Sequence, residues 1–162
     1  MSEESSHPSL VYHKVTSNEE FPAWAPREQV ARFFHETMAP YNDELPDVES
    51  AMDYALVPGV GAGGFVMLVG EENRLLGACC MLRTGMSGYI PEWILLFVTV
   101  DPSTRGRGIG GQLIERCLAE TDGDVKLHVE YDNPAKRLYE RLGFVSKYAE
   151  MRWQRAESGS QA

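Results

Sequence analysis

The sequence "VTVDPSTRGRGIGGQLI" spans Val98–Ile114 and joins an apolar run to a helical pattern through four closely spaced glycines. Glycine is a poor residue with which to start a helix, because ordering it costs more entropy than ordering other residues. The preceding run "WILLFVTV" is almost wholly apolar, which predicts a central strand covered on both faces. From 108 to 120 the apolar residues recur at helical spacing. The glycines therefore open a helix that follows a buried strand after a short connection.

This arrangement is typical of an anion site. The first N–H groups of a helix have no partner within it, the helix dipole is positive there, and glycines leave room for a phosphate to approach. Arg105 and Arg107 add two positive charges. A simple strand-to-helix turn needs one glycine rather than four, so the segment predicts a phosphate-binding loop.

A dinucleotide-binding loop is the alternative. Gly106, Gly108 and Gly111 spell G-x-G-x-x-G, and Glu130 follows 19 positions later as a carboxylate that could hold a ribose. Two features count against it, because residues 101–105 separate the strand from the glycines and only about fifty residues follow the motif. A nucleoside-triphosphate loop is excluded, since glutamine stands at position 112, where that motif requires lysine.

The rest of the chain alternates between strand and helix patterns. Periodicity and turn residues predict six strands, over 10–15, 65–70, 75–84, 93–100, 125–131 and 144–153. They predict helices over 26–38, from a cap at Asp47 to Leu56, over 108–120, and over 134–142 after Asn133. The order β-α-α-β-β-β-α-β-α-β predicts a mixed sheet with helices packed on it.

The composition of this 162-residue chain indicates one globular domain, which we expect to span 10–153 between a disordered leader (1–9) and a flexible tail (154–162). We expect a cytoplasmic protein, because the N-terminus lacks secretory features and no apolar run approaches the ~20 residues of a membrane helix. A net charge of −9 disfavours nucleic acid and acidic membranes as partners. Cys79, Cys80 and Cys117 lack metal-type spacing, so we expect buried thiols and no metal site.

Two segments resemble the GNAT superfamily of acetyl-CoA-dependent N-acetyltransferases. In "VDPSTRGRGIGGQLI", Arg105, Gly108 and Gly110 fill that family's R/Q-x-x-G-x-G/A pattern, and "DNPAKRLYERLGF" (132–144) is similar to its second cofactor segment. The resemblance covers 65–153. It implies an α/β (mixed α+β) fold of the GNAT acyl-CoA N-acyltransferase type, with four helices and a mostly antiparallel mixed sheet of about six to seven strands.

The resemblance also implies how acetyl-CoA binds. Its pyrophosphate would lie on the backbone amides of 105–111, and its pantetheine arm would lie beside the strand at 98–100, where an amide could also stabilise the oxyanion. The cofactor-binding residues are then Val98, Thr99, Val100, Arg105, Gly106, Arg107, Gly108, Ile109, Gly110, Gly111 and Asn133. A helix cap explains Asn133 equally well, and Val98 and Val100 can also be core residues.

For catalysis the resemblance assigns Tyr139 to protonate the departing thiolate, whereas packing on the core is the plainer explanation. The spacing from Asn133 to Tyr139 is six positions instead of the family's usual seven, so Asp132 occupies the usual place. The strand at 93–100 carries no carboxylate. Glu92 and Glu130 are therefore the candidate general bases, although each can simply be a solvated carboxylate.

No Lys or Arg occurs between Phe33 and Asn73, where eight acidic residues lie. In the family the first two helices line the acceptor site, so we expect a small primary or cationic amine there, bound by Tyr41, Glu44 and Asp47 and acetylated directly in a ternary complex. A solvated face is the plainer explanation of this charge. A sensor that binds acyl-CoA without turnover is the main alternative, and a homodimer is the default association state.

Overall fold

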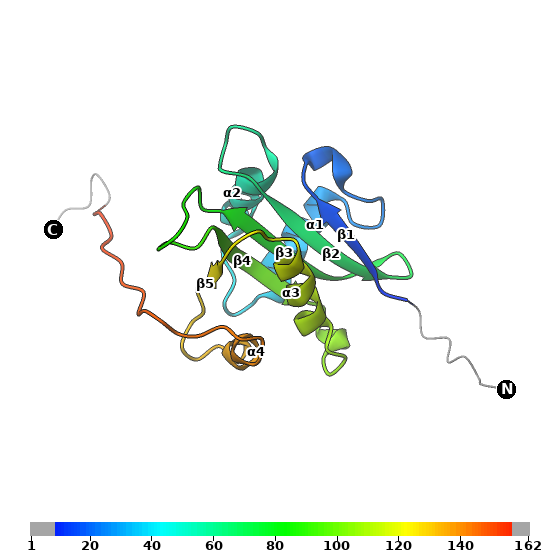
Figure 1. Ribbon diagram of the computed structural model, residues 1–162. Helices are drawn as coiled ribbons and strands as arrows, with labels where there is room; N and C mark the ends of the chain where they lie inside the picture. The colour runs from blue at the N-terminus through cyan, green and yellow to red at the C-terminus, as the bar shows by residue number, and fades with distance from the viewer. Residues whose placement is uncertain (1–8, 157–162) are drawn as a thin grey trace.

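A five-stranded sheet forms the centre of the computed structural model, which describes residues 9–156 (Figure 1). The spatial order follows the chain: β1 (Val11–Val15), β2 (Gly64–Glu71), β3 (Arg74–Arg83), β4 (Trp93–Val100) and β5 (Val125–Leu127). The first four strands pair antiparallel, and β5 pairs parallel to β4. The expected leader 1–9 lies outside the described residues except for its last position, and so does the expected tail beyond 156.

Helices cover both faces of this sheet. They are α1 (Arg27–Thr37), α2 (Leu45–Leu56), α3 (Ile109–Ala119) and α4 (Ala135–Arg141), with short 3-10 turns at Asn18–Glu20 and Pro102–Thr104. Leu68 and Cys80 point into the core shared with α1 and α2, whereas Met67 and Cys79 point into the core shared with α3 and α4. Alternate residues of one strand are thus buried on opposite faces, which explains why these strands are almost wholly apolar.

The second helix begins earlier than its sequence pattern predicts. Asp47 is not its cap: α2 starts at Leu45 after Glu44, with Pro46 in its first turn. The fixed φ of proline suits the first turn of a helix, and with Pro46 there the helix begins three residues earlier than predicted.

The prediction for the C-terminal part of the sheet is wrong. β5 stops at Leu127 instead of reaching 131, and the described residues after 144 form no strand, so the sheet has five strands rather than six. Residues 144–156 extend away from the body of the molecule (Figure 1) and leave Val145 84% and Trp153 77% exposed. A three-residue β5 offers only a short edge, which is too little for a ten-residue strand to pair with.

Candidate functional site

The loop from 101 to 108 leads from β4 into α3 and contains two glycines in the left-handed conformation. Gly106 and Gly108 have φ of +84° and +72°, in the left-handed region, and Gly108 is the residue before the first turn of α3. Other residues are strained in this conformation. A Cβ at either position would meet no atom within 4 Å, so this side of the loop is open.

The next two glycines are not required by the backbone. Gly110 and Gly111 are helical, and a Cβ there would lie 3.6 and 3.7 Å from the side chain of Leu138 on α4, an ordinary contact. Neither strain nor crowding inside the protein therefore explains glycine at these two positions. Close approach of a ligand to the first amides of α3 would explain it.

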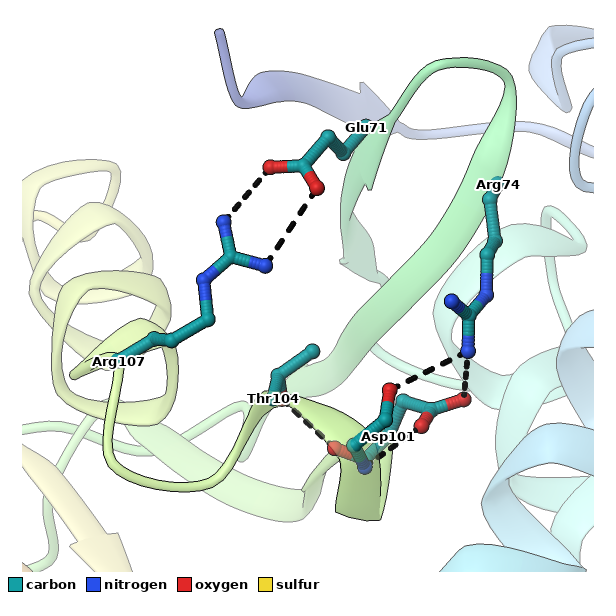
Figure 2. A network of polar contacts seen from close by, with 6 residues as sticks. Glu71, Arg74, Asp101, Thr104 and Arg107 are labelled. Carbon is teal, nitrogen blue, oxygen red and sulfur yellow. Dashed lines mark hydrogen bonds and ion pairs between the residues drawn. The ribbon is translucent and has the colours of Figure 1, made fainter. Parts of the chain in front are cut away.

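The two arginines of the loop differ in their surroundings. Arg107 forms a two-pronged ion pair with Glu71 of β2, with nitrogen–oxygen distances of 2.7 and 3.4 Å (Figure 2). This pair raises the pKa of Arg107. Arg105 is exposed, and its guanidinium has no ion pair among residues 9–156. Arg105 is thus the loop cation available to an anion.

β4 and β5 separate next to this loop. They pair only where Trp93, Ile94 and Leu95 face 125–127, and beyond that point no described strand lies on the β5 side of β4. The half-buried Val98 and Val100 pack into the core shared with α3, while the Thr99 hydroxyl lies 2.8 Å from that of Thr37 on α1. The divergence leaves one edge of 98–100 for a bound chain to pair with, in the manner of an added strand.

Tyr139 lies on α4 in the core beside α3. It is 9% exposed, and its ring stands edge-on to Phe144 at 6.0 Å between centroids. Burial raises the pKa of Tyr139 to about 12, and the nearby Cys79 thiol adds to this effect. Tyr139 therefore packs in the core, and its hydroxyl keeps its proton throughout the physiological pH range.

Asn133 acts as a cap, as one of its two predicted roles requires. Its Oδ1 accepts a hydrogen bond of 2.9 Å from the N–H of Ala135 at the start of α4. Asn133 also lines a surface hollow of about 500 Å³ together with Lys136 and Arg137. The cap uses the side-chain oxygen and leaves the amide nitrogen of Asn133 for other partners.

The two candidate bases lie in different places. The Glu92 carboxylate accepts hydrogen bonds from the N–H groups of Asp124, at 2.8 Å, and Gly88, at 3.4 Å. These bonds, that from Asp124 first, lower the pKa of Glu92. Glu92 precedes β4, whereas the glycine loop follows it. The contacts of Glu92 with Asp124 and Gly88 therefore lie at the opposite end of the strand from the glycine loop.

Glu130 lies close enough to Tyr41, one of the predicted acceptor-binding residues, for its charge to act on the Tyr41 hydroxyl. The Tyr41 hydroxyl, from the α1–α2 connection, donates a hydrogen bond of 3.2 Å to the carbonyl of Asp132 after β5. Desolvation raises the pKa of Tyr41, and the negative charges of Asp132 and Glu130 raise it further. The contact therefore brings the connection between the first two helices to the segment that precedes α4.

Glu44 and Asp47 are exposed at the start of α2, in the same part of the chain as Tyr41. Carboxylates at a helix N-terminus stabilise the helix, which explains their presence without a ligand. No Lys or Arg occurs between Phe33 and Asn73 in the sequence, and the charge of Arg152 interacts with Asp43 in this connection. Two contacts that the sequence did not reveal are the Thr37–Thr99 pair and the Glu71–Arg107 pair.

The described residues carry two further negative findings. No helix within residues 9–156 is long and apolar enough to cross a membrane. In the same part of the chain, no three His, Cys, Asp or Glu side chains are grouped so that they could hold a metal ion.

A strand that diverges from its parallel neighbour beside a glycine-rich helix start offers a pairing edge for an extended ligand arm and an anion site for phosphates. The model of the acetyltransferase (GNAT) domain family matches residues 62–146, and the chain belongs to this family. Members of the family are acetyltransferases that use acetyl-CoA, and residues 62–146 form a domain of this type. The resemblance seen in the two cofactor segments is thereby confirmed.

Among curated proteins, the chain is 37% identical over 97 residues to the mycothiol acetyltransferase of Actinosynnema mirum. That match takes in 57% of this chain but 31% of the relative, so the chain spans about a third of its length. Over 84 residues it is 31% identical to the 5-NmdU N-acetyltransferase of Pseudomonas phage PaMx11, with 51% and 58% of the two chains covered.

Among solved structures, an aminoglycoside acetyltransferase from an uncultured soil metagenomic sample, in complex with sisomicin, has a TM-score of 0.65. It is 17% identical, and the match covers 91% of this chain and 95% of that one. An aminoglycoside N-acetyltransferase in complex with CoA has a TM-score of 0.64 at 13% identity, covering 93% and 97%. These likenesses confirm the mixed α+β GNAT fold.

Proposed function

We propose that this protein transfers the acetyl group of acetyl-CoA to the nitrogen of a small primary or cationic amine, by direct attack while both substrates are bound. The observation that carries the proposal is the divergence of β4 from β5 directly before an open, glycine-rich start of α3. This geometry offers main-chain groups to an extended ligand arm and helix N–H groups to its phosphates.

The loop residues fit the cofactor. The amides of 105–111 other than those of Arg105 and Arg107, which donate to the carbonyls of Pro102 and Thr104, would receive the pyrophosphate. Arg105 would add an unpaired cation of the loop, and Gly110 and Gly111 would leave space. The exposed edge of β4 at Val98, Thr99 and Val100 would pair with the pantetheine arm. Asn133 would contribute its side-chain amide, because its oxygen is occupied by the cap.

In the reaction a carbon–nitrogen bond forms as the carbon–sulfur bond of the thioester breaks. The Tyr139 hydroxyl is protonated over the working pH range, so it can donate a hydrogen bond and then its proton to the departing thiolate. The attacking nitrogen must lose a proton, since an alkylamine is almost wholly protonated at neutral pH. Glu130 beside Tyr41 is the better-placed candidate for this proton, because Glu92 is engaged at the other end of β4.

The acceptor site we propose lies around Tyr41, Glu44 and Asp47. The acidic side chains and the lack of cations in this part of the chain favour a positively charged amine. Relatives named as mycothiol and aminoglycoside acetyltransferases support a small-molecule acceptor. A cytosolic location is supported by three buried free thiols, and the homodimer stays a prediction.

A screen of amines with acetyl-CoA tests the function. Release of free thiol together with a mass increase of one acetyl group on an amine supports the enzyme. Tight acetyl-CoA binding without thiol release for any amine would instead support the sensor. Thermal-shift comparison of acetyl-CoA with NAD and NADP tests the dinucleotide alternative, which requires a dinucleotide to stabilise the protein most.

A further inference from the structure

The turn between β2 and β3 places two opposite charges side by side. Glu72 and Asn73 have φ of 50° and 61°, which is the conformation of a two-residue hairpin turn whose twist matches that of the strands. Glu71 and Arg74 on either side are directly paired in the register. Each of these two side chains then reaches the loop that follows β4.

Glu71 holds the far end of that loop. Its carboxylate receives the two hydrogen bonds of Arg107, and it is only 17% exposed, against 44% for Arg107. Two parallel hydrogen bonds between guanidinium and carboxylate fix the orientation of both groups, which a single contact does not. The partner of Glu71 stands between the two left-handed glycines, Gly106 and Gly108.

Arg74 holds the near end. Its guanidinium donates to the Asp101 carboxylate and to the Ser103 hydroxyl, both at 3.2 Å (Figure 2). Asp101 in turn accepts from the N–H of Ser103 at 2.9 Å, and its carbonyl accepts from the buried Thr104 hydroxyl at 2.6 Å. The hairpin turn therefore contacts the loop at both ends of 101–107.

We propose that the β2–β3 turn is a brace that holds the glycine loop ready for an anion, with Glu71 as a positioning residue that acts through Arg107. The inference rests on the proposed assignment of this loop to the cofactor pyrophosphate. Glycines at 106 and 108 make the loop costly to order, and fixing it beforehand removes part of that cost from binding. Arg107 then serves as an anchor, and Arg105 supplies the charge that meets the phosphate.

The test measures CoA affinity by calorimetry, and KM and kcat separately, in Glu71→Gln and Arg74→Gln. We expect each variant to weaken CoA binding about fivefold, because each loses an ion pair that orders the loop. We expect kcat and the amine KM to stay within about twofold, since the brace contacts neither reacting atom. Arg74 is 61% exposed, so its substitution leaves the fold intact even if Glu71→Gln is unstable.

A charge-swapped double variant, Glu71→Arg with Arg107→Glu, separates an anchor from a phosphate ligand. If Arg107 is an anchor, the swap rebuilds the pair and restores CoA affinity beyond that of Glu71→Gln. If Arg107 itself binds phosphate, the double variant binds CoA more weakly than Glu71→Gln or Arg74→Gln does, and Glu71→Gln binds CoA more tightly than the parent. Either of these last results would overturn the brace.

The matched control is Glu120→Gln, which breaks an exposed ion pair with Lys14, 2.9 Å between nitrogen and oxygen. This pair lies at the other end of α3 from the loop, so the variant should leave CoA affinity unchanged. Arg105→Ala distinguishes failure of the brace from failure of the assignment of the loop to the cofactor pyrophosphate. Weak binding by Arg105→Ala with parental binding by the Glu71 and Arg74 variants refutes the brace and keeps the loop assignment. Parental binding by all of them refutes both.

Discussion

The side-chain oxygens of Thr37 and Thr99 lie 2.8 Å apart and join the last residue of α1 to β4. Thr37 already donates its hydroxyl hydrogen to the carbonyl of Phe33, at 2.5 Å, so Thr99 must be the donor of this bond. Thr99 also belongs to the strand edge assigned to the cofactor. The bond thus sets the position of the α1–α2 connection, with Tyr41, relative to that strand.

Replacing the Thr99 hydroxyl should weaken binding of the acceptor amine more than binding of CoA. Thr99→Val removes one partly buried hydrogen bond, which we expect to cost about 1 kcal/mol of unfolding free energy. The main chain of β4 remains, so the Kd for CoA should not change, whereas the amine KM should rise. Urea unfolding and steady-state kinetics measure both. An unchanged amine KM together with weaker CoA binding would contradict this division of roles.

The proton-donor role of Tyr139 predicts a loss of turnover without a loss of fold. Tyr139→Phe should lower kcat by about 10²-fold, the lower range for removing a general acid. The melting temperature and CoA affinity should stay near those of the parent, because the ring still packs against Phe144. Tyr89→Phe, which changes an 81% exposed tyrosine between β3 and β4, is the control. Full turnover of Tyr139→Phe at every pH would leave this residue a packing role only.

The glycines of the loop should respond differently to the same added methyl group. Gly108→Ala forces a side chain into the left-handed region and should cost about 1 to 2 kcal/mol of stability, with weaker CoA binding. Gly111→Ala fits beside Leu138 and removes a helical glycine, so stability should rise by up to about 1 kcal/mol. Calorimetry with CoA then shows whether Gly111 is kept for the ligand, since only a ligand explains weaker binding by this more stable variant.

The acceptor hypothesis predicts a selective effect of charge. Glu44→Gln with Asp47→Asn removes two exposed carboxylates near Tyr41 and should raise the KM for a cationic amine severalfold, while CoA affinity stays constant. The effect should shrink at high salt, because the charges are exposed to solvent. Glu115→Gln on α3 is a control of equal charge type. An amine KM equal to that of the parent would remove these residues from the acceptor site.

Acidification should loosen the loop through Asp101. The Ser103 hydroxyl and N–H, and then Arg74, hold the pKa of Asp101 below its ordinary value of 3.8. The ionised form is therefore favoured by folding, so its contribution is complete above pH 3.8 and is lost as the pH falls through the lower folded value. Asp101→Asn should be less stable than the parent at neutral pH, and the difference should narrow as the pH falls below 3.8. Urea unfolding at several pH values measures this, and a constant difference would contradict it.

Local patterns predicted most of the fold because they report on burial and backbone conformation. The hairpin of β2 and β3, the buried strand 93–100 and the glycine start of α3 are all confirmed. The final strand is not, although Phe144–Trp153 has residues suited to a strand. A strand needs an edge to pair with, and no property of those ten residues reveals that β5 ends at Leu127.

The site was predictable where one segment carries it and obscure where distant segments meet. The glycine loop and Asn133 as a cap follow from neighbouring residues. The pairing of Arg107 with Glu71, 36 positions earlier, depends on how the hairpin turn lies over the loop. The sequence therefore suggested two free cations, where the structure leaves Arg105 alone with that role among the described residues.

The short parallel contact of β4 with β5 also bears on how such proteins diverge. A docking edge made of peptide N–H and C=O groups is present whatever side chains the strand carries, provided that the strand forms. Substitutions can then accumulate along it without erasing the attachment point for a cofactor. The same architecture persists in chains that share as little as 13% of their residues with this one.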